Sequence, residues 1–359
     1  MAAERFRAIP RRGFERGSFR ARLNRFVIEA EVRGKTVLAH LPNPGRLWEI
    51  LFPGTELALQ PAPEGAKLPY KAAAARRKGR WVSLDTIRTN ALARHLLERE
   101  AVAGLEGWKI LSSEVPSGNS RFDFLLGRGP ERLFLEVKSC TLFQGPMAMF
   151  PDAVTERGRR HLLELAALGQ TGPRGAVLVV SQGPECRFFL PDYHTDPAFA
   201  QAFLGTRGRV GVHAVSVGWN EDLSLDEKIR PLEVPWEILE RTDPDSGAWL
   251  AISEGSGEPG TPPFTVRAGV ERPGLGRFMR KLERDRASRV VKVLPVRGYT
   301  GGAACLEKVL GLSAVSVENA PEPGGGRVFG YPGHPLDCPA FVEALLDLRL
   351  VYQPLGKMP

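Results

Sequence analysis

The feature that most constrains this chain is a pattern of charges inside two neighbouring apolar segments. Asp123 stands between Phe122 and Phe124 in "SRFDFLL", and Glu136 and Lys138 stand in "RLFLEVKS". Side chains at positions i and i+2 of a strand point to the same face of a sheet. A short turn rich in glycine and proline joins the two segments, so we expect the strands to be neighbours. The pattern therefore predicts that two carboxylates and one amine converge.

Two adjacent carboxylates repel each other unless a divalent cation neutralises them. Hard oxygen ligands suit Mg²⁺ or Mn²⁺, so we expect Asp123 and Glu136 to bind one of these metals. The amine of Lys138 can stabilise charge that develops on a phosphate or orient an attacking water. An acid followed by Glu-x-Lys on the next strand has the form of the PD-(D/E)-x-K motif of nucleases. The alternative is a solvated charge pair, although charges in so apolar a setting need partners.

The 359 residues of the chain allow for two or three domains. The predicted elements divide it into regions of different secondary structure. Short strands with Gly and Pro corners between residues 17 and 59 predict a small β-barrel. A helix, three strands, a helix and two further strands then predict one α/β domain. A segment rich in Gly, Ser, Pro and acidic residues predicts a linker before a small α+β domain. The predicted fold class is therefore mixed β and α/β in several domains, with boundaries at 1–80, 81–241, 242–263 and 264–359.

Positive charge is concentrated at the start of the chain. Residues 1–80 hold 17 Lys and Arg against 7 Asp and Glu, whereas residues 81–240 hold 17 against 21. Such a basic segment is typical of a polyanion-binding surface, because each neutralised phosphate releases a counterion. Nucleic acid is therefore the leading partner, and an Arg-rich solvated surface without a ligand is the alternative. The candidates for phosphate contact in this segment are Arg76, Arg77, Lys78 and Arg80.

Membrane and secreted proteins do not fit the sequence. The longest apolar run, from Ala176 to Val180, is far shorter than the roughly 20 residues of a membrane-spanning helix. The first twenty residues carry six arginines with no apolar run behind them, so no secretory signal is predicted. The four cysteines lie far apart without a C-x-x-C pair, which favours free thiols in a reducing compartment. We therefore expect a cytoplasmic protein without a membrane segment.

Four segments strengthen the nuclease interpretation through resemblance. They are "LPNPGRLWEILFPG", "RFDFLL", "LEVKS" and "FPDAVTERGRRHLLEL", and they resemble segments of the sugar fermentation stimulation protein family of bacteria and archaea. The similarity runs from about Phe14 to Glu240. It implies an OB-like N-terminal barrel, a restriction-endonuclease-like domain with the PD-(D/E)-x-K fold, and DNA as the partner. The chain departs from the family in the Ala- and Arg-rich segment 67–90, although Asn90 falls where the family has an asparagine.

The resemblance also implies which further residues line the cleft of Asp123, Glu136 and Lys138. These matched positions are Glu114, Arg121, Asp152, Thr155, Arg157 and His161, of which Glu114 and His161 join the catalytic candidates. Arg121 and Arg157 offer planar forks to phosphate, and Arg46 in "PNPGR", with the backbone of Gly45, is another phosphate candidate. The alternatives are helix capping for Asp152 and Thr155, a satisfied helix-face histidine for His161, and a turn without a ligand for Arg46.

Residues 264–359 lie outside this family and resemble a degenerate GIY-YIG-like domain. The residues that would begin such a nuclease are missing from "FTVRAGVERPGLGRF", so we expect this copy to bind or pack rather than to cut. One predicted helix is strongly basic, and phosphate contact and a solvated surface are its two interpretations. Its basic residues are Arg277, Arg280, Lys281, Arg284, Arg286 and Arg289, against Glu283 and Asp285.

The sequence leaves two main hypotheses of function. In the first, the chain binds DNA and hydrolyses phosphodiester bonds at a divalent-metal site. In the second, it is a regulatory protein that holds DNA with the same fold and does not cut it. A third hypothesis, an oligosaccharide-binding barrel, is disfavoured by the basic charge at the start of the chain. No recognition helix is evident, so we expect contacts with the DNA backbone, and the sequence leaves a homodimer open.

Overall fold

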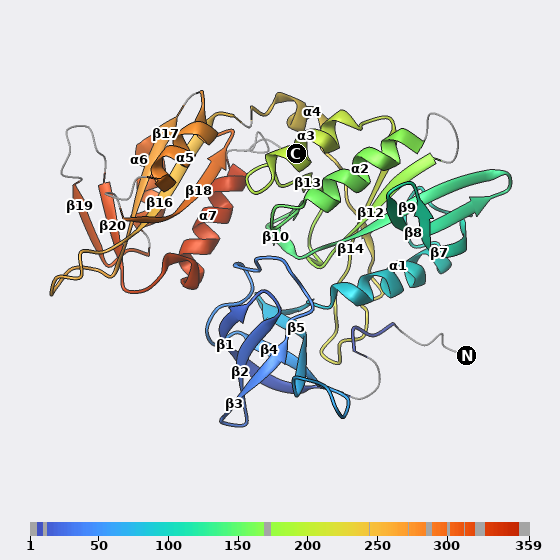
Figure 1. Cartoon of the computed structure of the whole chain (residues 1–359), viewed down its shortest axis with the longest axis horizontal. Coiled ribbons are helices and arrows are strands. Elements are labelled where there is room, and N and C mark those ends of the chain that lie inside the picture. The colour runs from blue at the N-terminus through green and yellow to red at the C-terminus, as the bar shows by residue number, and fades with distance from the viewer. Residues whose placement is uncertain are drawn as a thin grey trace. The chain divides into compact units, whose positions relative to one another are not determined.

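The computed structural model of the chain describes residues 6–9, 13–168, 174–243, 245–271, 273–284, 289–299, 302–311, 313–319 and 327–351. They form two compact units, drawn in Figure 1. Unit 1 comprises Met1–Asp192 with Ala198–Pro235, and unit 2 comprises Tyr193–Pro197 with Trp236–Pro359. Among the described helices, none combines the length and the apolar character needed to cross a membrane.

Unit 1 begins with a closed β-barrel, coloured blue in Figure 1. Its strands are β1 (Glu15–Asn24), β2 (Val27–Val32), β3 (Lys35–His40), β4 (Glu56–Pro61), β5 (Tyr70–Arg77) and β6 (Arg80–Ser83). Antiparallel pairings join β3 to β2, β2 to β1, β1 to β4 and β4 to β5, and a short parallel pairing of β3 with β5 closes the cylinder. This strand order confirms the OB-like barrel expected for the N-terminal region.

The alanine-rich strand β5 joins the barrel to the domain that follows. Ala72 and Ala75 belong to the barrel core, whereas Ala73 and Ala74 belong to the core of the α/β domain. All four side chains are fully buried. Small residues on both faces allow a strand to lie between two layers at close packing distance. The Ala-rich sequence at 72–75 therefore has a packing reason.

The α/β domain of unit 1 is built on a six-stranded sheet with the order β15-β14-β12-β9-β8-β7. Its strands are β7 (Lys109–Ser117), β8 (Ser120–Arg128), β9 (Glu131–Cys140), β12 (Arg174–Ser181), β14 (Val210–Ser216) and β15 (Arg230–Pro231). A second sheet contains β10 (Leu142–Gln144), β11 (Met147–Phe150) and β13 (Phe188–Pro191). The helical segments are η1 (Thr86–Arg88), α1 (Thr89–Glu98), α2 (Glu156–Leu168) and α3 (Pro197–Gly205). The predicted order of helices and strands is present, and the second sheet and α3 were not predicted.

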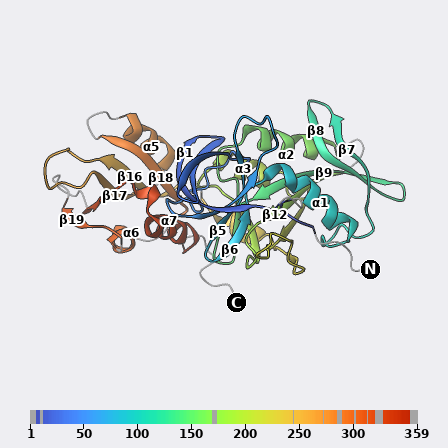
Figure 2. The ribbon, with the colours of Figure 1, turned by 90° about the horizontal axis from the view of Figure 1, so that it is seen from below.

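Helices α1 and α2 cover opposite faces of the main sheet. Side chains of strand β12 point alternately to the two helices. Ala176 and Leu178 share a core with the apolar side of α1, whereas Val177 and Val179 line a cavity beneath α2. Figure 2 shows α1 alongside β9 and β12. Because β9 pairs in parallel with β12, its own residues alternate in the same way. Glu136 and Lys138 therefore project toward α2.

Unit 2 is an α+β domain on a five-stranded antiparallel sheet with the order β18-β16-β17-β20-β19. Its strands are β16 (Gly247–Glu254), β17 (Phe264–Glu271), β18 (Val290–Arg297), β19 (Ser316–Asn319) and β20 (Arg327–Tyr331). Its helical segments are α4 (Trp236–Arg241), α5 (Leu275–Arg284), α6 (Ala303–Gly311), η3 (Pro335–Asp337) and α7 (Pro339–Val351).

The predicted linker at 242–263 is wrong for its central residues, which form strand β16. Ala248, Leu250 and Ile252 are fully buried between β17 and β18. Their apolar alternation is a strand signal, but the Gly, Ser and Pro residues that follow dominate the average composition of the segment. Those flanking residues form the connection from β16 to β17.

Candidate functional site

The two predicted carboxylates meet at the point where strands β8 and β9 separate. The ladder between these strands pairs Phe124 with Leu135, and continuing that register places Asp123 opposite Glu136. The backbone pairing stops there, and Asp123 Oδ2 instead accepts a hydrogen bond from the N–H of Val137 at 2.7 Å. Asp123 Oδ1 accepts a second bond, from Nδ2 of Asn90 on α1, at 2.6 Å. Asp123 is therefore fixed from both sides.

Glu136 is buried, and its hydrogen bonds to side chains are all made by one of its two oxygens. Oε1 accepts hydrogen bonds from Nζ of Lys138 at 2.5 Å and from Nδ1 of His161 at 2.6 Å. Oε2 is also buried and has no hydrogen-bond partner among the described residues. A carboxylate oxygen without a donor in the interior is costly, and this oxygen is available to a further ligand.

His161 reaches Glu136 from the next layer, because α2 lies over the face that carries Glu136. Arg157, one turn earlier on α2, donates from Nε to His161 Nε2 at 3.3 Å. Because Nε2 accepts, the proton of the imidazole resides on Nδ1, which donates to Glu136. His161 is 2% exposed. From this buried position His161 contacts Glu136, and its part in catalysis stays a prediction.

The pKa values of the two carboxylates show that they interact. Burial raises the pKa of Asp123, the charge of Glu136 raises it further, and the donors Val137 and Asn90 oppose both effects. Burial also disfavours the ionised form of Glu136, but His161 and Lys138 outweigh it and lower the pKa of this group. Mutual repulsion between carboxylates requires proximity, which agrees with the register that places Asp123 opposite Glu136.

The donor set fits a divalent cation of the magnesium type. Mg²⁺ in proteins is usually held by one or two carboxylates, with waters and substrate phosphates completing its shell. Glu136 Oε2 lacks a donor, and each oxygen of Asp123 keeps a lone pair beside the hydrogen bond that it accepts. Within the described ranges, no cluster of three or more His, Cys, Asp or Glu side chains forms a metal site. The protein ligands would therefore be Asp123 and Glu136.

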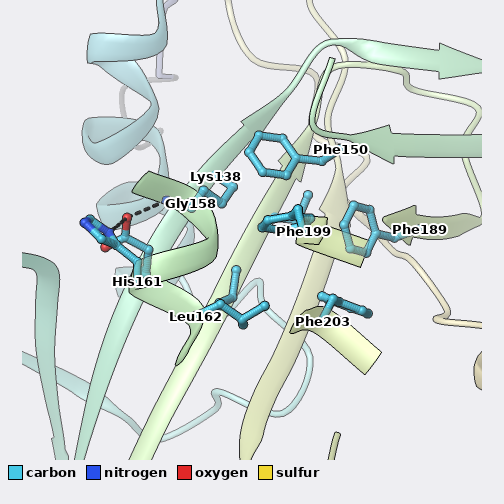
Figure 3. Close-up of a pocket in the computed structure, with 11 residues that line it drawn as sticks. Lys138, Phe150, Gly158, His161, Leu162, Phe189, Phe199 and Phe203 are labelled. Atoms are coloured by element: carbon cyan, nitrogen blue, oxygen red, sulfur yellow. Dashed lines mark hydrogen bonds and ion pairs between the residues drawn. The ribbon is translucent and has the colours of Figure 1, made fainter. Parts of the chain in front are cut away.

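Lys138 connects two cavities. On one side is a cavity of about 10 Å³, where Lys138 and His161 lie at one end and Phe150, Phe199 and Phe203 at the other (Figure 3). On the other side is an open cavity of about 250 Å³, which we call the cleft. The cleft lies between the barrel loop 42–45, the start of α1, the end of β9 and the loop before α2. Its polar lining includes Arg25, Asn43, Thr86, Asn90, Lys138 and Thr155.

The wall of the cleft formed by the barrel loop is held in place from behind. Arg22 donates to the carbonyl oxygens of Gly45 and Arg46 at 2.6 and 2.8 Å. Asp152, in the loop before α2, packs directly on Gly45, where a Cβ would lie 2.0 Å from Asp152 Oδ2. Asp152 also accepts the backbone N–H of Leu47. The motifs "PNPGR" and "FPDAVTERG" therefore pack against each other in the fold.

Most of the predicted phosphate contacts on the barrel have structural partners instead. Arg76 is bound by both oxygens of Glu221 at 2.7 Å and lies over the ring of Trp81. Arg77 is 5% exposed and donates to Gln144 and to the carbonyl of Phe143. Burial corrects the prediction that Arg77 contacts nucleic acid, and compensation by Glu221 removes the basis of the prediction for Arg76.

The remaining basic candidates do not line the cleft. Lys78 donates to Gln144 at 3.1 Å, and Arg80 is exposed at the end of the barrel. Arg46 lies over the ring of Trp48, 4.8 Å from its centroid, and the N–H of Gly45 is already taken by Asn43 Oδ1 at 2.9 Å. The N–H of Gly45 is thus occupied within the barrel loop, and phosphate contact by Arg46 stays a prediction.

Three of the residues matched by resemblance have local partners. Glu114 pairs with Arg121 at 2.8 Å, and both are exposed on the β7–β8 hairpin. The β7–β8 register places Glu114 opposite Asp123, but its carboxylate points to Arg121. Thr155 caps α2, because its Oγ1 accepts the N–H of Gly158 at 3.0 Å. The capping alternative for Thr155 is confirmed.

Sequence reasoning missed the residues that support the site from other segments. Asn90 was noted only as a match to the family, although it holds Asp123, and neither Arg22 nor Arg25 was considered. Arg25 lines the cleft, which is the position that was expected of the phosphate-binding arginines. The available signal was the basic turn between β1 and β2, "RLNRF", but nothing in the sequence shows that this turn faces the end of β9.

The two parts of unit 1 match two family descriptions. Residues 21–84 match the SfsA N-terminal OB domain, and residues 87–222 match the Sugar fermentation stimulation protein RE domain. These matches agree with the OB-like barrel and the nuclease-like α/β domain described above. The family descriptions thus cover the barrel loop, the carboxylates and the loop before α2.

Individual relatives show the same extent of similarity. The sugar fermentation stimulation protein homolog of Methanothermobacter thermautotrophicus is 39% identical over 218 residues, which are 60% of this chain and 90% of that protein. The homolog of Caldanaerobacter subterraneus is 38% identical over 187 residues, covering 52% and 82%. The solved structure of Pyrococcus furiosus SfsA in complex with Ca²⁺ is 27% identical, with a TM-score of 0.58, and covers 64% of this chain and 99% of that chain. On these matches, the chain belongs to the sugar fermentation stimulation protein family.

Proposed function

We propose that this protein binds DNA and hydrolyses its phosphodiester bonds in the cleft, with Mg²⁺ or Mn²⁺ as cofactor. The observation that carries the proposal is Glu136, whose Oε2 is buried and without a donor among the described residues, bonded through Oε1 to Lys138, which lines the cleft. A buried carboxylate oxygen that no protein group satisfies is a natural ligand for a cation. The calcium in the structure of the Pyrococcus furiosus relative supports an affinity of this fold for divalent ions.

Each residue around the carboxylates has a task in such a site. Asn90 and the backbone of Val137 hold Asp123, and His161 holds Glu136, so both acids are presented in one geometry. When bound, a divalent cation would polarise the phosphoryl oxygen and lower the pKa of a coordinated water. Lys138, at the border of the cleft, supplies a positive charge to the reacting phosphate.

The DNA backbone would be guided to the cleft by exposed arginines. Arg25 lines the cavity itself, and Arg157 is exposed at the start of α2, where its guanidinium also contacts His161. Arg121 extends the surface along the β7–β8 hairpin. The guanidinium group binds phosphate through two parallel hydrogen bonds, and such contacts carry no base specificity.

A second candidate function, DNA binding without cleavage, is favoured by one specific contact. Lys138 and His161 both donate to Glu136 Oε1, so the amine is already engaged with the carboxylate that it would assist. In this arrangement the three groups form a closed structural network. DNA would then be held by the same cleft and arginines in a regulatory role.

Incubation of the full chain with single- and double-stranded DNA and RNA distinguishes the two functions. We expect cleavage with Mg²⁺ or Mn²⁺ and none in EDTA. Glu136→Gln and Asp123→Asn should each lower the rate by about 100-fold or more, since each removes a charge that acts on the transition state. Glu131→Gln changes a carboxylate on the same strand that pairs with Arg128 at its other end, and it should cleave normally.

Metal affinity provides an independent measurement. By titration calorimetry, Mn²⁺ should bind wild type and Glu131→Gln alike and should lose its affinity for Glu136→Gln. Intact nucleic acids after incubation with either metal, together with normal DNA binding, would leave the non-cleaving function as the correct one. Glu114→Gln completes the series, because full activity in that variant removes Glu114 from the catalytic candidates.

A further inference from the structure

Helix α5 of unit 2 separates its side chains into two stripes. Leu275 is fully buried, and Phe278 packs on Trp249 of β16 with ring centroids 5.3 Å apart, so one stripe faces the sheet. The opposite stripe consists of Arg277, Arg280, Lys281 and Arg284, which are all exposed. These positions have the spacing i, i+3, i+4 and i+7 and therefore share one side of the helix.

No described acidic residue compensates the basic stripe. Its four side chains form no ion pair with any described residue, and the acidic residue of α5, Glu283, falls beside the stripe. Together the four line a shallow hollow of about 520 Å³. Asp285 and Arg286, which follow in the sequence, lie outside the described residues.

This arrangement costs the helix stability. Arg277 and Lys281, like Arg280 and Arg284, are like-charged neighbours at i and i+4, and such pairs destabilise a helix. Arg277 is also in the first turn, where the helix dipole disfavours a cation. Basic residues in the last turn are favourable without any ligand, but the presence of Arg277 in the first turn needs another explanation. A bound polyanion would offset the repulsion.

The geometry selects a nucleic-acid backbone among polyanions. Seven residues of helix span about 10 Å, which corresponds to about three phosphates of one strand when measured along the axis of a DNA duplex. A lipid surface would require the apolar stripe for insertion, and that stripe packs on Trp249. The stripe itself carries no aromatic ring for stacking on a base, so contact with phosphates alone is expected.

We infer that the stripe Arg277–Arg280–Lys281–Arg284 is a second nucleic-acid-binding site, which contacts the phosphate backbone independently of sequence. It extends the proposed function with a contact on unit 2 and does not depend on cleavage in unit 1. The part of the chain that carries it lies beyond the residues matched by the family descriptions, 21–84 and 87–222.

The test is the salt dependence of DNA binding by the full chain in EDTA, followed by fluorescence anisotropy of a labelled duplex. The test variant changes all four residues of the stripe to Gln. Each phosphate contact contributes about 0.9 to the slope of log affinity against log salt concentration. We expect the slope to fall by about 2 to 4 and the affinity at low salt to fall at least about tenfold.

A matched control removes the same charge from ion-paired surface positions of unit 1. It carries Arg33→Gln, Lys109→Gln, Arg128→Gln and Arg174→Gln, whose partners are Glu15, Glu100 and Glu131. This control should keep the slope of the wild type. A variant with Arg277, Arg280 and Arg284 changed to Lys should also keep it, because the charge remains, and circular dichroism reports whether α5 still folds.

Three results would overturn the inference. The first is an equal slope in the test variant and the charge-matched control. The second is a wild type that binds DNA without salt dependence, and the third is a wild type that binds vesicles of anionic phospholipid in preference to DNA. The same comparison made in a Glu136→Gln background separates this site from the catalytic proposal, since the effect of the stripe should persist when cleavage is absent.

Discussion

Glu49 is a buried carboxyl group whose environment predicts a measurable dependence of stability on pH. It lies after the barrel loop, is 4% exposed, and its Oε1 has no hydrogen-bond partner among the described residues. Burial is the main cause that raises the pKa of Glu49 from 4.5 to about 7, the charge of Arg77 opposes it, and the nearby Asp152 and Asp192 raise it further. The folded protein therefore favours the neutral form of this group.

The sign and size of the effect follow from proton linkage. Between pH 4.5 and about 7 the folded state binds the proton of Glu49 more tightly than the unfolded state does, so stability falls as pH rises. Each tenfold difference in proton affinity corresponds to about 1.4 kcal/mol. The difference between pKa 4.5 and about 7 therefore amounts to about 3 kcal/mol, present in full below pH 4.5 and lost by pH 8.

The variant Glu49→Gln carries a neutral side chain of similar shape at every pH. Relative to wild type, its free energy of unfolding should rise by about 3 kcal/mol between pH 4.5 and pH 8, while contributions of other groups cancel in the difference. Urea denaturation monitored by hydrogen exchange in peptides of unit 1 measures this free energy of unfolding without interference from unit 2. Glu64→Gln, at an exposed position, is the control for removal of a surface carboxylate.

The reasoning about Glu49 is refuted if the difference between Glu49→Gln and wild type is the same at pH 4.5 and pH 8. A smaller change of about 1 kcal/mol would place the pKa of Glu49 nearer its usual value and would indicate water near the carboxyl group. A variant that is less stable at pH 8 than wild type would mean that ionised Glu49 is held by Arg77 more strongly than burial penalises it.

Three further predictions concern single contacts elsewhere in the fold. Asn90→Ala should destabilise unit 1 by about 1.5 to 3 kcal/mol, because it removes the donor to the carboxylate of Asp123, and thermal unfolding measures the loss. Gly45→Ala should cost about 1 to 3 kcal/mol by forcing Asp152 off the barrel loop, and much less in an Asp152→Ala background. Burial lowers the pKa of His194 well below 6.5, so unit 2 should lose stability as pH falls below 6.5, and His194→Gln should remove this loss.

The fold of unit 1 was largely predictable because its patterns are local. The alternation in β9 places Glu136 and Lys138 on one face, and the short hairpin makes β8 its neighbour. Both statements need only strand geometry. The partner of Asp123 was not predictable in this way, since Asn90 lies more than thirty residues away on a helix. The linker was misjudged because average composition hid the buried alternation of β16.

The misassigned arginines have a different cause. Arg76 belongs to the most basic stretch of the sequence, yet its charge is compensated by Glu221, a residue 145 positions further along the chain. Net charge counted over a segment cannot include acids that the fold brings from elsewhere. Arg77 was misassigned for a related reason. Its burial depends on strand β10, a segment further along the chain that covers it, and a local sequence window does not contain that segment.

The distribution of compensated and uncompensated charge leads to a revised view of how the protein could hold nucleic acid. In the barrel, Arg16, Arg20 and Arg76 pair with Glu56, Glu31 and Glu221, so part of the basic charge at the start of the chain is already engaged within the fold. An ion-paired arginine releases no counterion when phosphate arrives unless its partner is displaced, which lowers its value for binding. Cations that have no partner among the described residues, as on α5, retain that value. Affinity for DNA should therefore follow the placement of unpaired charge, and a map of salt slopes for single Arg→Gln variants should rank Arg280 above Arg76.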